Sequence, residues 1–280
     1  MREINIDSII NTIEKLCIKS NYSLGKDVLS CLKKSFDTEE SKTGKHVIKQ
    51  IINNAEIAQN EKIAICQDTG MVVVFIEIGC EVHVVEGSVT DAINEGIRRG
   101  YKKGYLRKSI VSDPIKRENT KDNTPAVIHY ELVEGENISI TVVPKGFGSE
   151  NMGAIKMLKP SEGVDGIKKF VIDTVDRAGA NPCPPIIVGV GIGGTMEKAA
   201  IIAKKALIRP IGERSGLVHI RKMEEELLTK INKLGIGPAG FGGKVTALSV
   251  NIETYPTHIA GLPVAVNLNC HAARHASAIL

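Results

Sequence analysis

The sequence contains no tryptophan, and aromatic residues make up only 4% of its 280 residues. A hydrophobic core must therefore rest on isoleucine, valine, leucine and alanine; apolar residues amount to 42% of the chain, an ordinary share for a globular protein. No apolar run approaches the roughly 20 residues that a membrane-spanning helix needs. The N-terminal segment carries acidic residues and lacks the apolar centre of a secretion signal. We therefore expect a cytoplasmic protein with no membrane partner.

Long runs of like charge are also missing. Lysine and arginine total 36 against 32 aspartates and glutamates, and the net charge of +4 is spread along the chain. Nucleic-acid binding calls for a concentrated basic surface, so we expect no nucleic-acid partner. A small anionic substrate suits this weak positive charge. Six cysteines are too few for a disulfide framework in a chain of this length, and thiols stay reduced in the cytoplasm.

Helical and strand-like patterns are interleaved along the chain, which predicts an α+β fold. We expect a helical N-terminal segment over residues 1–60, followed over residues 61–280 by a mixed or antiparallel sheet packed with helices, all within one domain. Ser88 and Gly104 are placed to cap the helix at 89–103. Strands are expected at 71–79, 81–86, 184–190, 245–253 and 263–269, a hairpin at 126–133 and 137–144, and further helices at 161–177, 195–206, 216–234 and just after Cys270.

Three cysteines stand in unrelated loop-like contexts rather than in CxxC pairs. Cys66 lies in CQDTG, Cys183 in NPCPP and Cys270 in NCHAARH, more than 80 residues from one another. Three thiolates on separate loops could hold an iron–sulfur cluster whose fourth iron stays open to substrate as a Lewis acid. Small buried cysteines are the alternative. We interpret the remaining cysteines, Cys17, Cys31 and Cys80, as packing residues.

Two loops carry further chemistry. CQDTG places a thiol, an amide, a carboxylate and a hydroxyl on a turn before a strand, which is typical either of an active-site loop or of an ordinary turn. KGFGSENMGA, at 145–154, is rich in glycine. Its backbone N–H groups could bind a carboxylate oxygen, or the segment could be a simple connection.

Two other patterns have competing explanations. GVGIGG, at 189–194, follows a strand and precedes a helix, as a dinucleotide fingerprint does. The required second strand with its acidic residue is missing, because the next region reads IRPIGERSG. The glycines then serve close packing or an anion at the helix N-terminus. Near the C-terminus, His271 and His275 would share a helix face, which makes a zinc site conceivable; His275 could equally be a solvated helix residue.

Six motifs taken together resemble the α component of the iron–sulfur hydro-lyases, which comprise class I fumarate hydratases and L-tartrate dehydratases. They are CQDTG, KGFGSEN, NPCPP, GVGIGGTMEKA, GPAGFGGKVTAL and NCHAARHA, and they span nearly the whole chain in order. The resemblance implies a [4Fe–4S] cluster held by loops and a site for a small dicarboxylate. It implies metal ligands at Cys66, Cys183 and Cys270, substrate contacts at Gln67, Arg107, Gly148 and His258, and an acid–base role for Asp68.

The same resemblance implies a partner. Single-chain members of the family carry a second half with further arginines, a lysine and a catalytic threonine, whereas this sequence stops soon after the third cysteine motif. We therefore expect a separate β subunit and a hetero-oligomer. The leading expectation is reversible hydration of fumarate to malate, a tricarboxylic acid cycle reaction. The alternative is an L-tartrate dehydratase α subunit, and a non-catalytic cluster-binding or nucleotide-binding module is more remote.

Overall fold

The computed structural model describes residues 1–280, which form two compact units. The first unit contains Met1–Gly25, Asn54–Phe147 and Arg274–Leu280, and the second contains Lys26–Asn53 and Gly148–Ala273. Three helices occupy the N-terminal region as expected: α1 (Ile6–Tyr22), α2 (Lys26–Thr38) and α3 (Lys42–Glu61). The α+β prediction is confirmed, while the expectation that residues 1–280 act as one domain stays a prediction.

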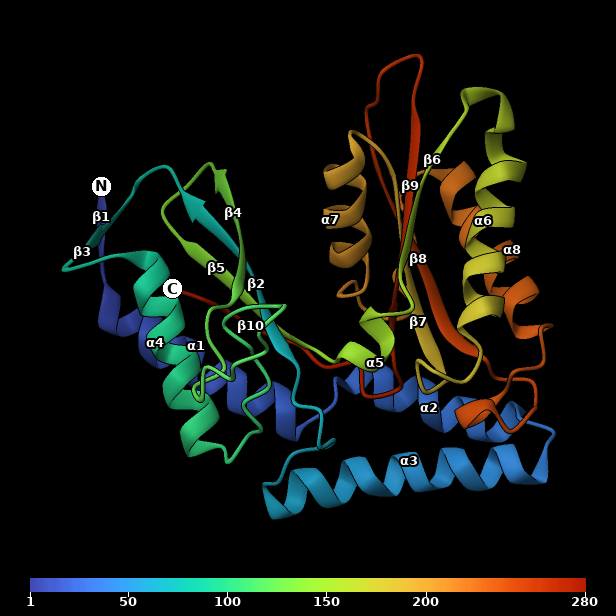
Figure 1. Cartoon of the computed structure of the whole chain (residues 1–280), viewed down its shortest axis with the longest axis horizontal. Helices are drawn as coiled ribbons and strands as arrows, with labels where there is room; N and C mark the ends of the chain where they lie inside the picture. Colours follow the sequence, from blue (N-terminus) through green and yellow to red (C-terminus); the bar gives the residue numbers. More distant parts are fainter. The chain divides into compact units, whose positions relative to one another are not determined.

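The first unit is built on a four-stranded sheet in the order β10-β5-β2-β4 (Figure 1). Helices α1 and α4 (Val89–Lys103) pack together, and alternate residues of β2 and β5 join their apolar sides in one core. A small parallel pair, β1 and β3, accompanies this sheet. The strands are β1 (Arg2–Asn5), β2 (Met71–Gly79), β3 (Val82–Val85), β4 (Val127–Val133), β5 (Ile138–Lys145) and β10 (Ala276–Ile279).

The predicted hairpin is wrong in its pairing, although both strands lie where expected. β2 runs between β4 and β5, parallel to the first and antiparallel to the second. The turn that joins β4 to β5 crosses the end of β2, where the N–H of Gly79 donates to Asn137 O at 2.9 Å. A Cβ at Gly79 would stand 2.2 Å from Gly135 O, so glycine allows this close approach.

The second unit is built on another four-stranded sheet, in the order β6-β9-β7-β8. Helices α6 (Gly163–Ala178) and α8 (Val218–Asn232) cover one face, and α7 (Met196–Ala206) covers the other (Figure 1). Two short 3-10 turns, Pro160–Glu162 and Pro238–Gly240, and the short helix α5 (Phe147–Glu150) complete the chain. The strands are β6 (Ala154–Leu158), β7 (Ile186–Gly193), β8 (Ala247–Tyr255) and β9 (Leu262–Asn269).

The first three glycines of GVGIGG lie in β7, and two of them allow close packing. A Cβ at Gly189 would stand 2.2 Å from Ala203 O, and one at Gly191 would stand 2.1 Å from Ala199 O. Both carbonyls belong to α7, so this helix can approach the strand only because side chains are absent there. The close-packing explanation is thus confirmed, and the IRPIGERSG segment forms no strand, as expected.

The helix expected after Cys270 is wrong. Residues 271–275 are irregular and lead into β10, which pairs antiparallel with β5. Leu280 and Ile138 exchange backbone hydrogen bonds of 2.8 and 3.0 Å, so the sheet edge satisfies backbone groups that a helix would otherwise pair. His271 and His275 therefore share no helix face. None of the helices combines the length and apolar character needed to cross a bilayer.

Candidate active site

The CQDTG loop connects α3 to β2 and is held by buried side chains of the first unit. The Tyr101 hydroxyl donates to Thr69 O at 2.6 Å, and Asn123 Nδ2 donates to Gly70 O at 3.2 Å. Gly70 has a φ of +76°, and a Cβ there would stand 2.8 Å from the backbone of Lys145. The loop thus needs glycine at this position, and its conformation is set by groups from α4, from the loop of Asn123 and from β5.

Asp68, the carboxylate of this loop, is held by two backbone N–H groups. Its Oδ1 accepts the N–H of Gly70 at 3.0 Å, and its Oδ2 accepts the N–H of Phe147 at 2.9 Å. Arg274, which is 3% exposed, donates to the backbone carbonyl of Asp68. Carboxylate oxygens have further lone pairs, so two N–H bonds orient the group without exhausting its capacity to accept a proton.

Arg107 and Gln67 form a second contact beside Asp68. Nη1 of Arg107 donates to Oε1 of Gln67 at 2.7 Å, and both side chains are exposed. The Thr69 hydroxyl donates to the carbonyl of Arg107 at 2.8 Å, which ties the arginine's backbone to the same loop. The first unit therefore brings Arg107 to Gln67 and Thr69, in the loop that also carries Cys66 and Asp68.

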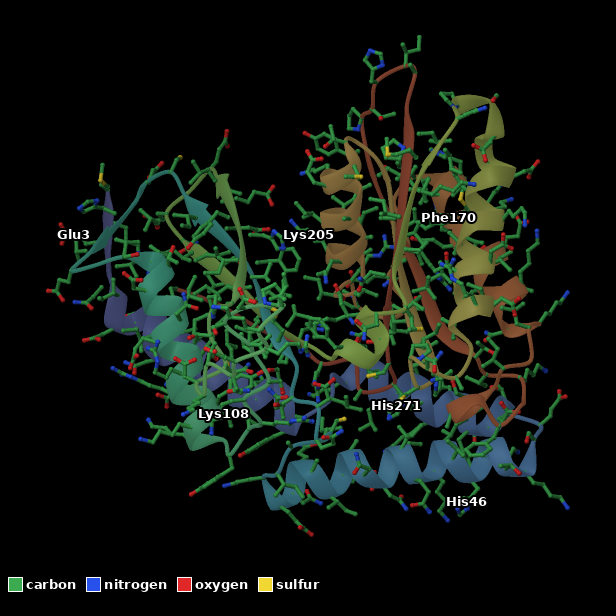
Figure 2. All side chains as sticks on the ribbon, in the orientation of Figure 1. Glu3, His46, Lys108, Phe170, Lys205 and His271 are labelled. Carbon is green, nitrogen blue, oxygen red and sulfur yellow. The ribbon has the colours of Figure 1, made fainter.

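In the second unit, Cys183 and Cys270 lie at the same end of the sheet. Cys183 precedes β7 and Cys270 follows β9, and these strands pair antiparallel with Ile187 opposite Asn269. The backbone N–H of His271 donates to Cys183 O at 3.3 Å, and its ring Nδ1 lies 3.0 Å from the same oxygen. Figure 2 labels His271 at this end of the sheet. The two cysteine loops are thus in direct contact.

The other two substrate-binding candidates occupy different places in this unit. Gly148 lies in the short helix α5, and a Cβ there would have Asn181 O, in the Cys183 loop, as its nearest neighbour at 3.7 Å. His258 lies in the exposed β8–β9 connection, at the opposite end of the sheet from the cysteines. Its Nδ1 accepts the N–H of Ala260 at 3.1 Å. The second unit thus brings Gly148, but not His258, to the cysteine loops.

The six cysteines differ in exposure: Cys17 is buried, whereas Cys31 is half-buried like Cys66 and Cys270. Cys183 is exposed, and Cys66 and Cys270 are half-buried, so their thiols remain accessible. Burial, reinforced by the Glu14 carboxylate, raises the pKa of Cys17, and burial also raises the pKa of Cys31. A thiol must lose its proton to bind a metal, which disfavours both. Cys80 is exposed, so its interpretation as a packing residue is wrong.

The donor chemistry of the three loop cysteines fits an iron–sulfur cluster. Such clusters take thiolate ligands, and these three thiols are the accessible ones that lie in the distinctive loops. Cys66 belongs to the first unit, and Cys183 and Cys270 belong to the second. Within the structure, no three histidine, cysteine, aspartate or glutamate side chains gather closely enough to hold a metal ion.

Several residues that hold the CQDTG loop through hydrogen bonds were not predicted from the sequence. Tyr101 is hidden in an ordinary helical pattern, and Asn123, which is fully buried with a φ of +63°, lies in a polar stretch without a motif. Arg274 was visible as the arginine of NCHAARH, but its contact with Asp68 bridges 206 positions. Only Arg274 therefore had a usable signal, because it stands inside a distinctive motif.

The first unit thus groups an oriented carboxylate with an arginine–glutamine pair, and the second unit by itself brings two cysteine loops into contact. The chain belongs to the fumarate hydratase (Fumerase) family of hydro-lyases, whose model matches residues 10–279. It is 43% identical over 274 residues to "Putative L(+)-tartrate dehydratase subunit alpha" of Methanocaldococcus jannaschii, with 96% of each chain covered. It is 30% identical over 289 residues to L(+)-tartrate dehydratase subunit alpha of Escherichia coli K12, covering 100% of this chain and 94% of that protein.

Proposed function

We propose that this chain is the α subunit of a two-subunit iron–sulfur hydro-lyase that dehydrates L(+)-tartrate. The observation that carries the proposal is the grouping of Asp68, Gln67 and Arg107 on and beside the loop of Cys66. The names of the relatives support tartrate as the substrate and α as the subunit type. A cytoplasmic location and a place in a larger hetero-oligomer remain predictions.

Reversible hydration of fumarate to malate is the second candidate, and the name of the matching family supports it. Both reactions remove a proton from a carbon beside a carboxylate while hydroxide leaves the neighbouring carbon and a double bond forms. Tartrate differs from malate by one more hydroxyl group. Recognition of this extra hydroxyl decides between the two substrates. A role in the tricarboxylic acid cycle would follow only if fumarate is the substrate.

We assign Cys66, Cys183 and Cys270 as the ligands of a [4Fe–4S] cluster. When bound, the cluster supplies an open iron that polarises the departing oxygen as a Lewis acid. Arg107 grips one substrate carboxylate through paired N–H groups, and Gln67 orients its guanidinium. Asp68 moves the proton at the carbon, either directly or in support of a residue on the β subunit. Gly148 and His258 are assigned to substrate binding.

The substrate is tested with the full α chain reconstituted anaerobically with its β subunit. The complex is assayed separately with L(+)-tartrate, malate and fumarate, and kcat/KM is compared. Preference for tartrate supports the proposal, whereas preference for malate and fumarate supports the second candidate. A complex with normal iron content that turns over none of the three would favour the non-catalytic cluster-binding module.

Cysteine substitution tests the cluster independently of substrate. We predict that the anaerobic complex carries about four irons and absorbs through sulfur-to-iron charge transfer. Cys66→Ser, Cys183→Ser or Cys270→Ser should remove or greatly weaken both signals, because serine offers no thiolate. Cys17→Ser, Cys31→Ser and Cys80→Ser serve as controls with iron retained. The assignment would be contradicted if a control cysteine proved essential for iron binding while one of the first three proved dispensable. Stoichiometric zinc in place of iron would indicate a zinc site instead.

A further inference from the structure

Glu39, at the junction of α2 and α3, is a buried carboxylate bound by backbone N–H groups. It is 1% exposed. Oε1 accepts the N–H of Glu40 at 2.8 Å and that of Ser41 at 2.9 Å. Lys244 N reaches both oxygens, at 3.0 and 2.9 Å, and Val245 N donates to Oε2 at 2.9 Å. The carboxylate thus joins the helix junction to a segment 205 positions away.

Glycines allow this cradle to close around the carboxylate. A Cβ at Gly243 would stand 2.7 Å from Oε1 of Glu39, and φ there is +128°. A Cβ at Gly44 would stand 3.0 Å from Cδ of the same side chain. Larger residues would push the N–H groups away, so the GFGGKV part of the GPAGFGGKVTAL motif is shaped to bind Glu39.

The segment bound by Glu39, residues 237–245, contacts the Cys183 loop directly. Residues 237–243 fold back on themselves, with Gly242 N donating to Ile236 O at 2.9 Å. The N–H of Ala239 then donates to Pro184 O at 2.8 Å. A Cβ at Gly240 would stand 2.3 Å from Cβ of Ala180. The glycine loop therefore touches the Cys183 loop on both sides of the cysteine.

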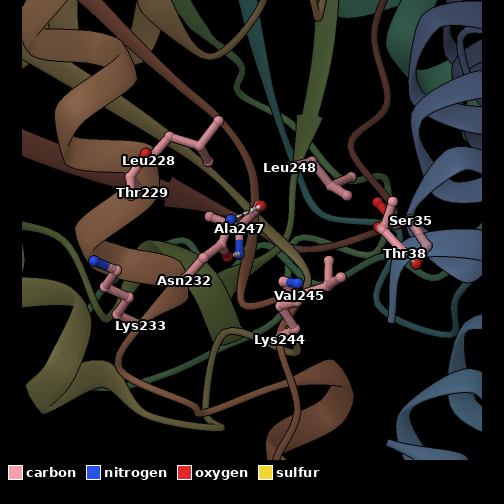
Figure 3. A pocket seen from close by; sticks show the side chains of 10 residues that line it. All are labelled: Ser35, Thr38, Leu228, Thr229, Asn232, Lys233, Lys244, Val245, Ala247 and Leu248. Atoms are coloured by element: carbon pink, nitrogen blue, oxygen red, sulfur yellow. Dashed lines mark hydrogen bonds between the residues drawn. The ribbon is translucent and has the colours of Figure 1, made fainter. Parts of the chain in front are cut away.

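Side-chain oxygens bind the backbone of residues 244–247, which are also packed, since Val245 and Ala247 are buried. A pocket of about 410 Å³ lies between α2, α8 and residues 244–248, and Figure 3 shows the side chains that line it. Across it, Oδ1 of Asn232 accepts the N–H groups of Thr246 and Ala247, each at 2.8 Å. Glu39 and Asn232 thus supply acceptors for the four consecutive N–H groups of residues 244–247.

We propose that Glu39 is a positioning residue for Cys183, acting through the 237–245 loop. The inference rests on the proposed function, in which Cys183 is a cluster ligand. Cys183 has a φ of +54°, which is unfavourable for a residue with a side chain, so its conformation persists only while neighbouring loops impose it. The clamp supplies this restraint from the helix junction.

The chemistry of the clamp requires a carboxylate. Four backbone N–H groups point at Glu39, and two oxygens with several lone pairs can accept all of them. A glutamine would offer one oxygen and turn an NH2 group toward N–H donors. Each buried N–H left without an acceptor is costly, so Glu39→Gln should release the loop.

The test measures Cys183 directly in the full chain without iron. Alkylation of Cys183 is followed by mass spectrometry, with exposed Cys80 as the internal standard. We expect Glu39→Gln to change the Cys183 rate by roughly tenfold, in keeping with the loss of a buried hydrogen-bond acceptor. Glu39→Asp, which keeps both oxygens on a shorter arm, should give a smaller change. Glu40→Gln is the matched control, because this neighbouring carboxylate is exposed and accepts from the Lys244 ammonium at 2.8 Å rather than from the backbone N–H groups that bind Glu39.

A second control separates positioning from general loss of stability. Leu227→Ala removes a fully buried core side chain of the same unit without touching the clamp. If it lowers Tm as much as Glu39→Gln and alters Cys183 alkylation equally, the proposal is overturned. Unchanged alkylation in Glu39→Gln also overturns it. Should Glu39→Gln fail to fold, the comparison of Glu39→Asp with Leu227→Ala decides.

Iron uptake then distinguishes this inference from the proposed function. After anaerobic reconstitution, we expect less iron per chain in Glu39→Gln than in Glu40→Gln. A wild-type complex that takes up no iron would defeat the cluster assignment while leaving the alkylation result as the test of Glu39. Normal iron in the wild type with unchanged alkylation in Glu39→Gln would defeat the role of Glu39 alone.

Discussion

Arg107 is the residue whose chemistry is hardest to replace by another cation. Its Nη1 holds Gln67 at 2.7 Å, and its remaining N–H groups form a planar fork suited to a carboxylate. We predict that Arg107→Lys raises KM for the dicarboxylate by roughly tenfold or more, because an ammonium cannot keep both partners. Iron per chain should not change. Arg99→Lys, in an exposed ion pair with Glu95, is the control, and an unaltered KM in Arg107→Lys would remove the residue from the substrate grip.

Glu39 should also leave a signature in the pH dependence of stability. Burial would raise the pKa of Glu39, but four backbone N–H groups outweigh it and hold the pKa below its usual range. A carboxylate with a lowered folded pKa stabilises fully above the ordinary value of about 4.3 and loses this effect as pH falls through the folded pKa. We predict that the Tm difference between wild type and Glu39→Gln is steady above that value and shrinks below it. A difference independent of pH would mean that folding leaves the pKa of Glu39 unchanged, which would contradict a carboxylate held by the four N–H groups.

Residues such as Glu39 and Tyr101 could not be identified from the sequence. Each binds backbone groups that lie far away in the chain, Lys244 at 205 positions from Glu39 and Thr69 at 32 positions from Tyr101. Cys66, Gln67 and Asp68 could be selected as candidates, because a thiol, an amide and a carboxylate adjoin on a turn. Local clustering of chemistry is readable in a sequence, whereas long-range support of that chemistry is not.

Individual elements were predictable where local signals are strong. α4 begins and ends as expected, since Ser88 accepts the N–H of Asp91 and Gly104 N donates to Gly100 O. The apolar run of β2 also matches its strand. Strand pairing was not predictable, because nothing within residues 126–144 indicates that β2 runs between β4 and β5. The C-terminal segment 276–279 became a strand because an edge of β5 was available.

The contact between β7 and α7 yields a prediction at the level of elements. Gly191→Ala would place a methyl group 2.1 Å from Ala199 O, so the helix must move away from the strand. We expect a loss of about 1–3 kcal/mol in the free energy of unfolding, as for other overpacked cores. Gly216→Ala, where an added Cβ meets nothing within 4 Å, is the matched control. Denaturant unfolding measures both, and equal midpoints would show that α7 is not held by close approach.

At the scale of the whole molecule, the chain offers part of what a dicarboxylate needs. Arg107 can hold one carboxylate, while Arg274 is buried and donates to the backbone carbonyls of Asp68 and Pro144. The second carboxylate needs another cation, which the proposed β subunit would contribute. The loops with Asp68, Cys183 and Cys270 remain accessible for such a partner, since none of these three residues is fully buried.

We therefore predict that the purified α chain is inactive, tends to self-associate and regains hydro-lyase activity when mixed with β. Activity should rise with added β until the two chains are equimolar, and size-exclusion chromatography should show α and β eluting together. The Cys80→Ser variant of α lacks an exposed thiol that lies outside the proposed ligands. Under anaerobic conditions, it should regain no more activity with β than the unchanged α chain does. Full turnover by α alone would mean that this chain itself supplies the second carboxylate grip and the complete acid–base pair.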